Sequence, residues 1–323
     1  MAKATKNSNL NKAGIAKEDE FYTKITDIEK ELRYYRDYLR GKVVFCNCDD
    51  PETSNFWLYF RLNFYELGLK KLISTHFEAD KPSYKLEIIS TDKDAQLGLP
   101  EYIKTPLTQN GDFRSPECIE ILKEADVVIT NPPFSLFREY VAQLIEYNKK
   151  FIIIGRETAI TYKEIFTLLR DGIVWLGYNN GDMEFLVPDY YEPRDTRYRE
   201  ENGQKYRSLG NIIWLTNIDI PKRHDDIIVY KSYSPEEYQK YDNYDAINVN
   251  KIADIPADYD GVMGVPITLF HKHNPEQFEI VGLLAGNIKG LAGIPSKSGK
   301  DGPYINGKLK FGRILVRNKR VLK

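Results

Sequence analysis

Residues 125–135 read Ala125-Asp126-Val127-Val128-Ile129-Thr130-Asn131-Pro132-Pro133-Phe134-Ser135 and join a strand pattern to a helix pattern. The first six residues are rich in β-branched side chains and predict a short buried strand. After Ser135, which suits a helix N-cap, apolar side chains recur three and four positions apart on one helical face. They are Leu136, Phe137, Tyr140, Val141, Leu144 and Ile145. Asn131 therefore lies in a loop at the carboxyl end of a buried strand, where open α/β sheets bind ligands.

The loop after this strand favours a planar ligand that carries an amine. Pro132 and Pro133 fix two φ angles and have no backbone N–H, so the loop is stiff. The carbonyl oxygens of Asn131 and Pro132, with the Asn131 side-chain oxygen, are acceptors, and the ring of Phe134 offers a face for stacking. The alternative is an ordinary proline-rich turn before a helix, with Phe134 packed as a hydrophobic staple.

Length and composition predict a soluble globular protein of about two domains. The chain has 323 residues, 42% of them hydrophobic and 29% charged, and single cores rarely exceed about 250–300 residues. The sequence has no apolar run long enough to span a membrane. Residues 1–17 are polar and predict a flexible arm, since they lack the apolar core of a secretory signal. The three cysteines are too few for a disulfide framework and favour a reducing compartment, so the predicted location is cytoplasmic.

Charge is distributed unevenly along the chain. Residues 289–323 contain ten of the 46 Lys and Arg residues but only one of the 47 acidic residues, Asp301. A basic tail on an acidic body predicts a surface that contacts phosphates. The alternative is a pair of solvated strands with outward Lys and Arg side chains.

The chain alternates strand and helix patterns four or five times, which predicts a doubly wound, mostly parallel sheet covered by helices on both faces. Predicted strands are 42–48, 69–77, 84–90, 125–130, 150–155, 173–178, 183–187 and 211–218, and predicted helices lie within 19–40, 56–67, 115–123, 136–145 and 165–169. Residues 92–110 are rich in Gly, Pro and Thr and are predicted to be a loop. Residues 190–209 are charged and show no periodicity, which predicts a long surface loop. The predicted first domain is 18–220, and 221–323 form a smaller mixed α+β domain.

Five segments, taken in order, resemble the EcoRI-type adenine-specific DNA methyltransferases. They are Asp19-Glu20-Phe21-Tyr22-Thr23, Lys42-Val43-Val44-Phe45-Cys46-Asn47-Cys48-Asp49-Asp50-Pro51, Gly111-Asp112-Phe113, Asn131-Pro132-Pro133-Phe134-Ser135-Leu136-Phe137-Arg138-Glu139 and Met263-Gly264-Val265-Pro266-Ile267-Thr268. The resemblance implies a class I methyltransferase-like, Rossmann-like domain at 18–220 and a target-recognition, DNA-binding region at 221–323. It also implies a monomeric enzyme of a restriction–modification system, or an orphan modification enzyme.

The implied reaction moves a methyl group from S-adenosylmethionine to the exocyclic amine of adenine in a specific double-stranded DNA sequence. The implied catalytic residues are Asn131, Pro132, Pro133 and Phe134. Acceptors at Asn131 and Pro132 would hold both N–H groups of the amine, so catalysis rests on orientation and electrostatics. The base must first leave the helix, and stacking on Phe134 offsets part of the unstacking free energy.

The implied cofactor contacts lie on four other segments. Phe21, Tyr22 and Thr23 would lie near the methionine end, Asn47 and Asp49 at the end of the first strand, Glu78 at the ribose, and Asp112 with Phe113 at the adenine. Each has a structural alternative: Asp49 caps the next helix, Glu78 is solvated, and Asp112 is a turn residue.

One departure concerns the first turn, because methyltransferases of this fold usually have glycines there and residues 46–51 contain none. A metal site at Cys46, Cys48 and His76 lacks a fourth ligand, so no metal is predicted. His271 and His273 are predicted to be a surface strand pair.

Other functions share parts of this pattern. Methyltransferases that act on protein glutamine or ribosomal RNA use a similar loop, but the order of the motifs, the second domain and the basic tail favour DNA. A catalytically silent DNA-binding protein would not need the intact sequence from Asn131 to Phe134. Residues 289–323 and 190–209 are predicted to contact DNA phosphates.

Overall fold

The computed structural model describes residues 21–48, 50–79, 81–90, 98–285 and 289–322. The predicted arm at 1–17 and the predicted cofactor residue Asp49 lie outside these residues. The chain divides into two compact units. The first contains the described residues up to Glu157 together with Gly177–Thr216, and the second contains Thr158–Leu176 and the residues from Asn217 onward. The sequence predicts a boundary near residue 220 and includes 158–176 in the first domain.

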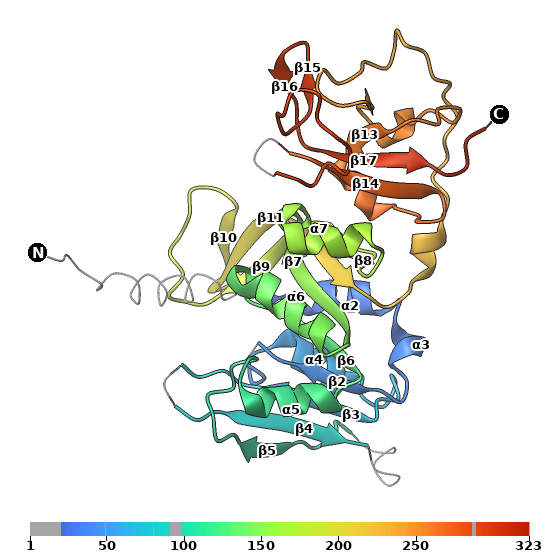
Figure 1. Cartoon of the computed structure of the whole chain (residues 1–323). Coiled ribbons are helices and arrows are strands. Elements are labelled where there is room, and N and C mark those ends of the chain that lie inside the picture. Colours follow the sequence, from blue (N-terminus) through green and yellow to red (C-terminus); the bar gives the residue numbers. More distant parts are fainter. Residues whose placement is uncertain (1–20, 49, 80, 91–97, 286–288, 323) are drawn as a thin grey trace, which may run out of the picture. The chain divides into compact units, whose positions relative to one another are not determined.

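The first unit is built on one large mixed sheet, which confirms the α/β class (Figure 1). Its strand order is β1-β9-β11-β7-β6-β2-β3-β4-β5, with β10 paired to β11. The strands are β1 (Tyr22–Thr23), β2 (Val43–Cys46), β3 (Lys71–Thr75), β4 (Tyr84–Ile89), β5 (Ile103–Pro106), β6 (Val127–Thr130), β7 (Lys150–Arg156), β9 (Gly181–Val187), β10 (Tyr198–Glu201) and β11 (Gln204–Thr216). Figure 1 shows β4 and β5 at one edge of the sheet and β9 and β10 toward the other.

Parallel pairing is found in the centre of this sheet. Among the described strands β7, β6, β2 and β3 are parallel neighbours, whereas the pairs on either side of them are antiparallel. The prediction of a mostly parallel sheet therefore holds only for these four strands. The outer strands β4 and β5 each pair antiparallel with the strand that precedes them in the chain.

Two of the described helices connect neighbouring central strands: α4 (Asn55–Leu62) follows β2, and α6 (Phe137–Glu146) follows β6. The other described helices of this unit are α2 (Ile25–Leu32) and α3 (Arg36–Leu39), which precede β2, and α5 (Pro116–Glu124), which precedes β6. The Ser115 side chain accepts a hydrogen bond from the Cys118 N–H at 3.2 Å, with Pro116 at the first helical position, as the sequence predicted. Ser135 is not the N-cap of α6. A 3-10 turn, η1 (Phe134–Leu136), precedes that helix and is closed by a hydrogen bond from the Leu136 N–H to the Pro133 carbonyl oxygen.

The stretch 190–209 is not a loop throughout, because residues 198–201 and 204–209 form β10 and the start of β11. Asn202 and Gly203 join them at φ angles of 51° and 75°. Two successive positive φ angles match the twist of a two-residue hairpin, and Asn-Gly is the sequence that adopts them most readily. The residues around this dipeptide are charged and show no alternation of apolar and polar side chains, so the sequence does not predict the hairpin. In 92–110, residues 103–106 form β5, so that prediction of a loop is also wrong there.

The second unit has a smaller mixed sheet with strand order β12-β13-β17-β14. Its elements are α7 (Lys163–Arg170), β8 (Trp175–Leu176), η3 (Pro221–His224), β12 (Ile247–Asn248), η4 (Ile252–Asp254), β13 (Met263–Pro266), η5 (Ile267–His271), β14 (Phe278–Leu284), β15 (Tyr304–Ile305), β16 (Lys308–Leu309) and β17 (Arg313–Asn318). Tyr241, Tyr244, Ile305 and Leu315 belong to its buried core. No described helix in either unit is long and apolar enough to cross a membrane.

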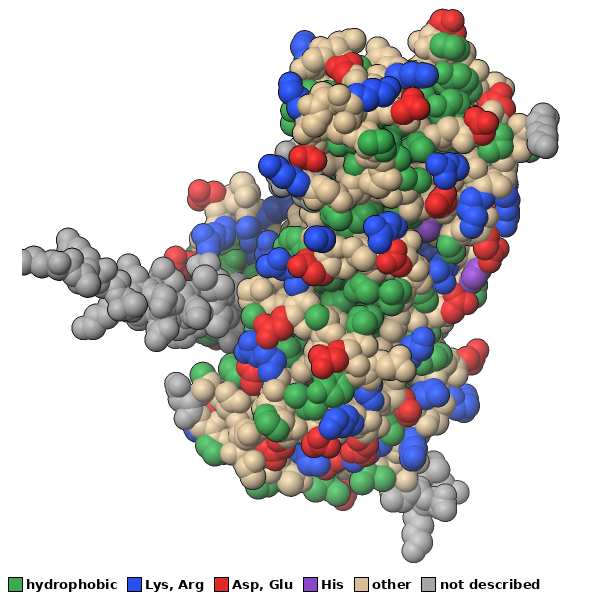
Figure 2. Space-filling view, in the orientation of Figure 1, with side chains coloured by type: hydrophobic (Ala, Val, Ile, Leu, Met, Phe, Trp, Pro, Cys, Tyr) green, Lys and Arg blue, Asp and Glu red, His purple; other side chains and the backbone are tan. Residues whose placement is uncertain are grey.

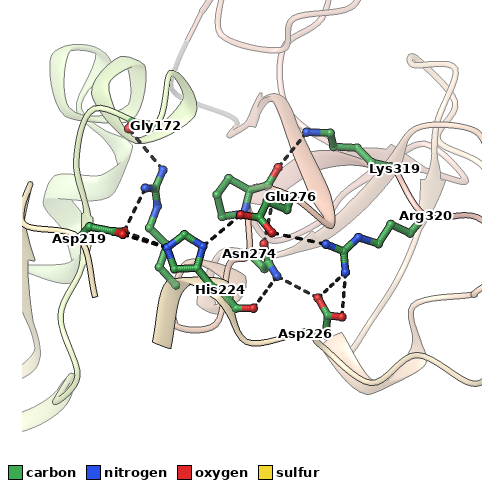
Figure 3. A network of polar contacts seen from close by, with 10 residues as sticks. Gly172, Asp219, His224, Asp226, Asn274, Glu276, Lys319 and Arg320 are labelled. Atoms are coloured by element: carbon green, nitrogen blue, oxygen red, sulfur yellow. Dashed lines mark hydrogen bonds and ion pairs between the residues drawn. The ribbon is translucent and has the colours of Figure 1, made fainter. Parts of the chain in front are cut away.

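A network of charged side chains ties η3 to distant parts of the second unit (Figure 3). The His224 ring lies between Asp219, at 3.0 Å from Nε2, and Glu276, at 3.1 Å from Nδ1. These two hydrogen bonds raise the pKa of His224 above its ordinary value. Near the end of the chain, Arg320 donates two hydrogen bonds of 2.8 Å to Asp226.

His273 does not belong to a surface strand pair, so that prediction is wrong. Its Nε2 lies 2.8 Å from the Phe278 carbonyl oxygen, and its ring meets that of Phe270 edge to face. Burial lowers the pKa of His273 to about 4, and the nearby cations Arg223 and Lys319 act in the same direction.

The depressed pKa of His273 predicts a loss of stability at acidic pH. The unfolded chain binds a proton at His273 near its ordinary pKa of 6.5, whereas the folded chain does so only near 4. The free energy of unfolding should therefore fall as the pH drops from 6.5 to 4, by about 3 kcal/mol from this group. Urea unfolding of the wild type and of His273→Phe across this range measures the effect. An equal pH slope in both proteins would contradict it.

Candidate active site

Asn131 follows β6 directly and is fixed by a carbonyl from the start of the described chain. Its Nδ2 donates a hydrogen bond of 2.6 Å to the Phe21 carbonyl oxygen. A carbonyl can only accept, so this contact decides which end of the amide is nitrogen. The Oδ1 atom is buried and has no hydrogen-bond partner among the described residues. Since Asn131 is only 7% exposed, this acceptor lies in the protein interior and receives no hydrogen bond from the described part of the chain.

Aromatic rings cluster around Phe21, whose carbonyl binds Asn131, and around Phe134 of the same loop. The ring of Phe134 stacks against that of Phe21, with centroids 5.9 Å apart and planes at 30°, and meets Phe185 edge to face at 6.3 Å. Phe21 also contacts Tyr191 edge to face. The Arg156 guanidinium, at the carboxyl end of β7, lies over the Phe134 ring at 5.3 Å. Phe134 is half-buried, so these neighbours leave part of its surface open to a ligand.

The segment 21–23 connects this loop to the helix after β2. Tyr22 and Thr23 form β1, which pairs with β9. The Thr23 carbonyl oxygen accepts a hydrogen bond of 2.8 Å from Asn55 Nδ2, near the start of α4. Thr23 Oγ1 is a second buried polar atom that has no hydrogen-bond partner within the described part of the chain. The predicted residues at 21–23 are thus placed beside Asn131 by backbone contacts that the sequence did not reveal.

The turn after β2 contains no glycine, and hydrogen bonds to Asn47 hold it in place. Cys48 adopts a φ of 74°, in the left-handed region that glycine usually occupies. Asn47 is 2% exposed; its carbonyl oxygen accepts from the Thr130 hydroxyl, and its side-chain Oδ1 accepts from the Tyr140 hydroxyl. Burial holds the pKa of Tyr140 well above its ordinary value, so this hydroxyl stays a donor. Asn47 is therefore bound to both the strand and the helix that flank the Asn131 loop.

Asn110 brings Glu78 and Asp112 together. Its carbonyl oxygen accepts from the Glu78 N–H at 2.8 Å, and its side-chain Oδ1 accepts from the Asp112 N–H at 3.2 Å. Between them Gly111 has a φ of 78°, and a Cβ atom there would lie 1.8 Å from the His76 carbonyl oxygen. Only glycine allows these two segments to approach so closely.

Asp112 is held by its neighbour Arg114. Its Oδ1 accepts from the Arg114 N–H and Nε at 2.8 Å each, and its Oδ2 accepts from Nη2 at 2.6 Å. Burial alone would raise the pKa of Asp112, but the hydrogen bonds from Arg114 outweigh it and hold the pKa below the usual range. Oδ2 keeps one acceptor position for a further donor. The adjacent Phe113 is 6% exposed and meets the Tyr140 ring edge to face at 5.0 Å.

The described site residues thus form a connected set at the carboxyl ends of the central parallel strands. Asn110, Tyr140 and Phe185 join the predicted residues there, although none of the three is predicted from the sequence. Tyr140 carried a signal, because a tyrosine on the buried stripe of a helix needs a partner for its hydroxyl. Asn110 and Phe185 carried none.

Comparison with known proteins identifies the family. The family described as "Adenine-specific methyltransferase EcoRI" matches residues 9–319. The chain belongs to the EcoRI adenine-specific methyltransferase family. It is 47% identical to the type II methyltransferase M.EcoRI of Escherichia coli over 337 residues, covering 100% of both chains.

Two type II methyltransferases from mycoplasmas are also similar along nearly their whole length. M.MgeORF184P of Mycoplasma genitalium is 38% identical, with 97% of this chain and 99% of the relative covered. M.MpnI of Mycoplasma pneumoniae is 37% identical, with 96% and 98% covered. The protein is a type II, adenine-specific DNA methyltransferase of the restriction–modification type. The alternatives of a ribosomal RNA or protein-glutamine methyltransferase and of a catalytically silent DNA-binding protein are therefore set aside.

Proposed function

We propose that this methyltransferase acts on an adenine that has left duplex DNA and entered the pocket formed by Asn131, Pro132, Pro133 and Phe134. One observation carries the proposal: the buried Oδ1 of Asn131, which has no hydrogen-bond partner among the described residues. An unpaired buried acceptor is unfavourable by about 1–3 kcal/mol. An adenine amine, which has two N–H donors, relieves this penalty on binding.

In the proposed reaction the pocket holds and orients the exocyclic amine of adenine. The lone pair of this amine is delocalised into the purine ring, so the free amine is a poor nucleophile. With one N–H bonded to Asn131 Oδ1 and the other to the Pro132 carbonyl oxygen, the nitrogen is drawn toward a tetrahedral geometry and its lone pair is oriented. S-adenosylmethionine would supply an electrophilic methyl group on a sulfonium. Phe134 would stack on the extruded base and offset part of the unstacking free energy, a few kcal/mol.

Family membership implies S-adenosylmethionine as the cofactor. The remaining predicted residues have side chains that suit its different parts. Thr23 Oγ1 is a buried oxygen without a partner among the described residues, suited to the methionine end. Glu78 has a partly exposed carboxylate, suited to ribose hydroxyls. The remaining acceptor position of Asp112 suits an exocyclic amine, beside the buried ring of Phe113. Phe21, Tyr22, Asn47 and Asp49 complete the proposed set, with Asn47 positioned by Tyr140 and Phe21 acting through its carbonyl on Asn131.

Other parts of the proposal concern the whole chain. The four parallel strands and their helices support a class I methyltransferase-like, doubly wound core in residues 18–220. Residues 221–323 would serve target recognition. We also propose that the protein acts as a monomer in the cytoplasm. Sequencing of DNA incubated with the protein and S-adenosylmethionine, with detection of modified bases, tests the reaction. The expected result is N6-methyladenine at one recurring duplex sequence, and unmodified DNA would refute it.

The hairpin of β10 and β11 and the segment before it are proposed to contact DNA phosphates. Arg194 and Arg197 are exposed there, and each phosphate contact contributes about 0.9 to the slope of log K against log salt. Changing both arginines to glutamine should make the slope shallower by about 2. Lys70→Gln with Lys150→Gln is the matched control, because these lysines lie at the amino ends of β3 and β7, away from the carboxyl edge. An unchanged slope in the arginine variant would place DNA elsewhere.

A further inference from the structure

Phe311 is an unusually exposed aromatic residue in the second unit. It follows the hairpin of β15 and β16, and its exposed fraction of 86% is the highest of any large apolar side chain that the structure describes. Leu309, two residues earlier, is 50% exposed. Leaving a phenyl ring in water forgoes about 2 kcal/mol of burial free energy. The exposure of this ring therefore suggests that it contacts a binding partner.

The exposure of Phe311 does not follow from a loose loop, because the preceding hairpin is braced. The two carboxylate oxygens of Asp242 accept from the N–H groups of Asn306 and Gly307 at 3.1 and 2.7 Å. Asn243, which is 2% exposed, accepts from the Tyr304 N–H at 3.2 Å and donates to two further carbonyl oxygens. A buried asparagine thus holds the base of this hairpin.

Phe311 itself lies between two anchored positions. On one side the Lys310 N–H donates to the Pro303 carbonyl oxygen at 2.8 Å. On the other side Arg313 begins the central strand β17, and its Nη1 lies 3.4 Å from the Phe311 carbonyl oxygen and 3.2 Å from that of Gly312. The backbone is therefore fixed on both sides, and the ring is presented to solvent in advance of any partner.

The charged side chains closest to Phe311 in the sequence are positive. Lys308 and Lys310 are exposed, and neither forms an ion pair with any residue that the structure describes. The nearby carboxylate of Asp242 is engaged by the hairpin turn. Figure 2, in contrast, shows basic and acidic side chains intermingled over the visible face of the molecule. An apolar ring flanked by unpaired lysines complements a polyanion with an apolar interior, and the established substrate, DNA, has both properties.

We infer that Phe311 is a wedge that enters a base step of duplex DNA while Lys308 and Lys310 hold the flanking phosphates. Apolar side chains that enter a step separate the stacked bases and kink the duplex. A kinked duplex has lost part of the stacking that opposes extrusion of a base, so the wedge would lower the free energy of moving adenine to Asn131. This inference rests on the proposed base-flipping function.

The test compares Phe311→Ala with Ile228→Ala in the full-length protein. Ile228 is a matched control, because it is 83% exposed but follows Asp225 and Asp226. The probe is an unmethylated duplex of about 30 base pairs that contains the sequence the protein methylates, with a fluorophore at each end to report bending. Dissociation constants are measured at several salt concentrations, together with methyl transfer and the thermal midpoint.

Phe311→Ala should bind the duplex at least about tenfold more weakly, lose the bending signal, and keep the wild-type salt slope and thermal midpoint. Phe311→Leu should retain most of the duplex affinity and of the bending signal. Lys308→Gln with Lys310→Gln should make the slope shallower by about 2. Ile228→Ala should behave as wild type.

Three results would overturn the wedge: wild-type affinity and bending in Phe311→Ala, an equal loss in Ile228→Ala, or a change confined to self-association, which would make Phe311 a protein contact. The proposed function is tested separately from the wedge. A wild-type protein that methylates no duplex refutes the proposed function, whereas normal wild-type methylation with an unaltered Phe311→Ala variant refutes the wedge alone.

Discussion

Replacing Asn131 by alanine is expected to reduce the rate of methyl transfer by about two to three orders of magnitude. The substitution removes the buried Oδ1 acceptor that would orient the adenine amine, while the aromatic walls of Phe21, Phe134 and Phe185 remain. Stability should fall by only about 1 kcal/mol, because a single hydrogen bond to the Phe21 carbonyl is lost. Single-turnover transfer of a tritiated methyl group, with calorimetric binding of S-adenosylmethionine as a second readout, measures both effects. Cofactor affinity should change less than threefold.

Asn55→Ala is the matched control for this prediction. Asn55 donates the same kind of amide–carbonyl bond to the neighbouring strand, at Thr23, but offers no acceptor to the pocket in the proposed mechanism. It should lose similar stability and keep the rate of the chemical step within about tenfold. If Asn131→Ala retained near-normal transfer, or if the two variants lost equal activity, the orienting role of Oδ1 would be wrong.

Replacing Gly111 by alanine is expected to cause the largest loss of stability of any single change considered for this protein. The new Cβ would lie 1.8 Å from the His76 carbonyl oxygen, far inside van der Waals contact, and both partners are backbone. The backbone must therefore move, and the contacts through Asn110 that join Glu78 to Asp112 must break. We expect a loss of more than about 4 kcal/mol in the free energy of unfolding, together with loss of cofactor binding.

Gly41→Ala separates the two causes of this effect. Gly41 has a φ of 72°, close to the 78° of Gly111, but no atom lies within 4 Å of its added Cβ. Since the described residues beyond its chain neighbours leave this Cβ free of contact, its substitution should show the strain of the left-handed backbone alone, about 1 kcal/mol. Urea unfolding of both variants measures the difference. Equal losses at the two positions would mean that the close approach to His76 contributes nothing.

Much of the central fold could be predicted from the sequence because its signals are local. The β-branched residues before Asn131 and the Ser115-Pro116 cap indicated a strand and a helix start that the structure confirms. The four strands that can be buried on both faces read as continuous apolar runs. The hairpin at the edge was not predicted, because β10 and the first half of β11 are charged and partly solvated, so that their pattern resembles that of a loop.

The site was predictable only in part, for a related reason. Motif residues such as Asn131 and Asp112 stand out by their type and position. Their partners do not, because Phe21, Asn110 and Arg114 act through backbone groups or through neighbours of ordinary composition. The prediction that Ser135 caps a helix failed because two prolines favour a tight 3-10 turn before α6 begins.

The hydrogen bond between Asn131 and Phe21 gives the short strand β1 a consequence beyond stability. If the Phe21 carbonyl withdrew, the amide of Asn131 would be free to rotate by half a turn and present its NH₂ group where the oxygen now lies. Two sets of N–H donors would then face each other, and the pocket would repel the amine that we propose it binds. A slip of one residue in the pairing of β1 with β9 would thus switch the pocket from attraction to repulsion while the central sheet stayed intact.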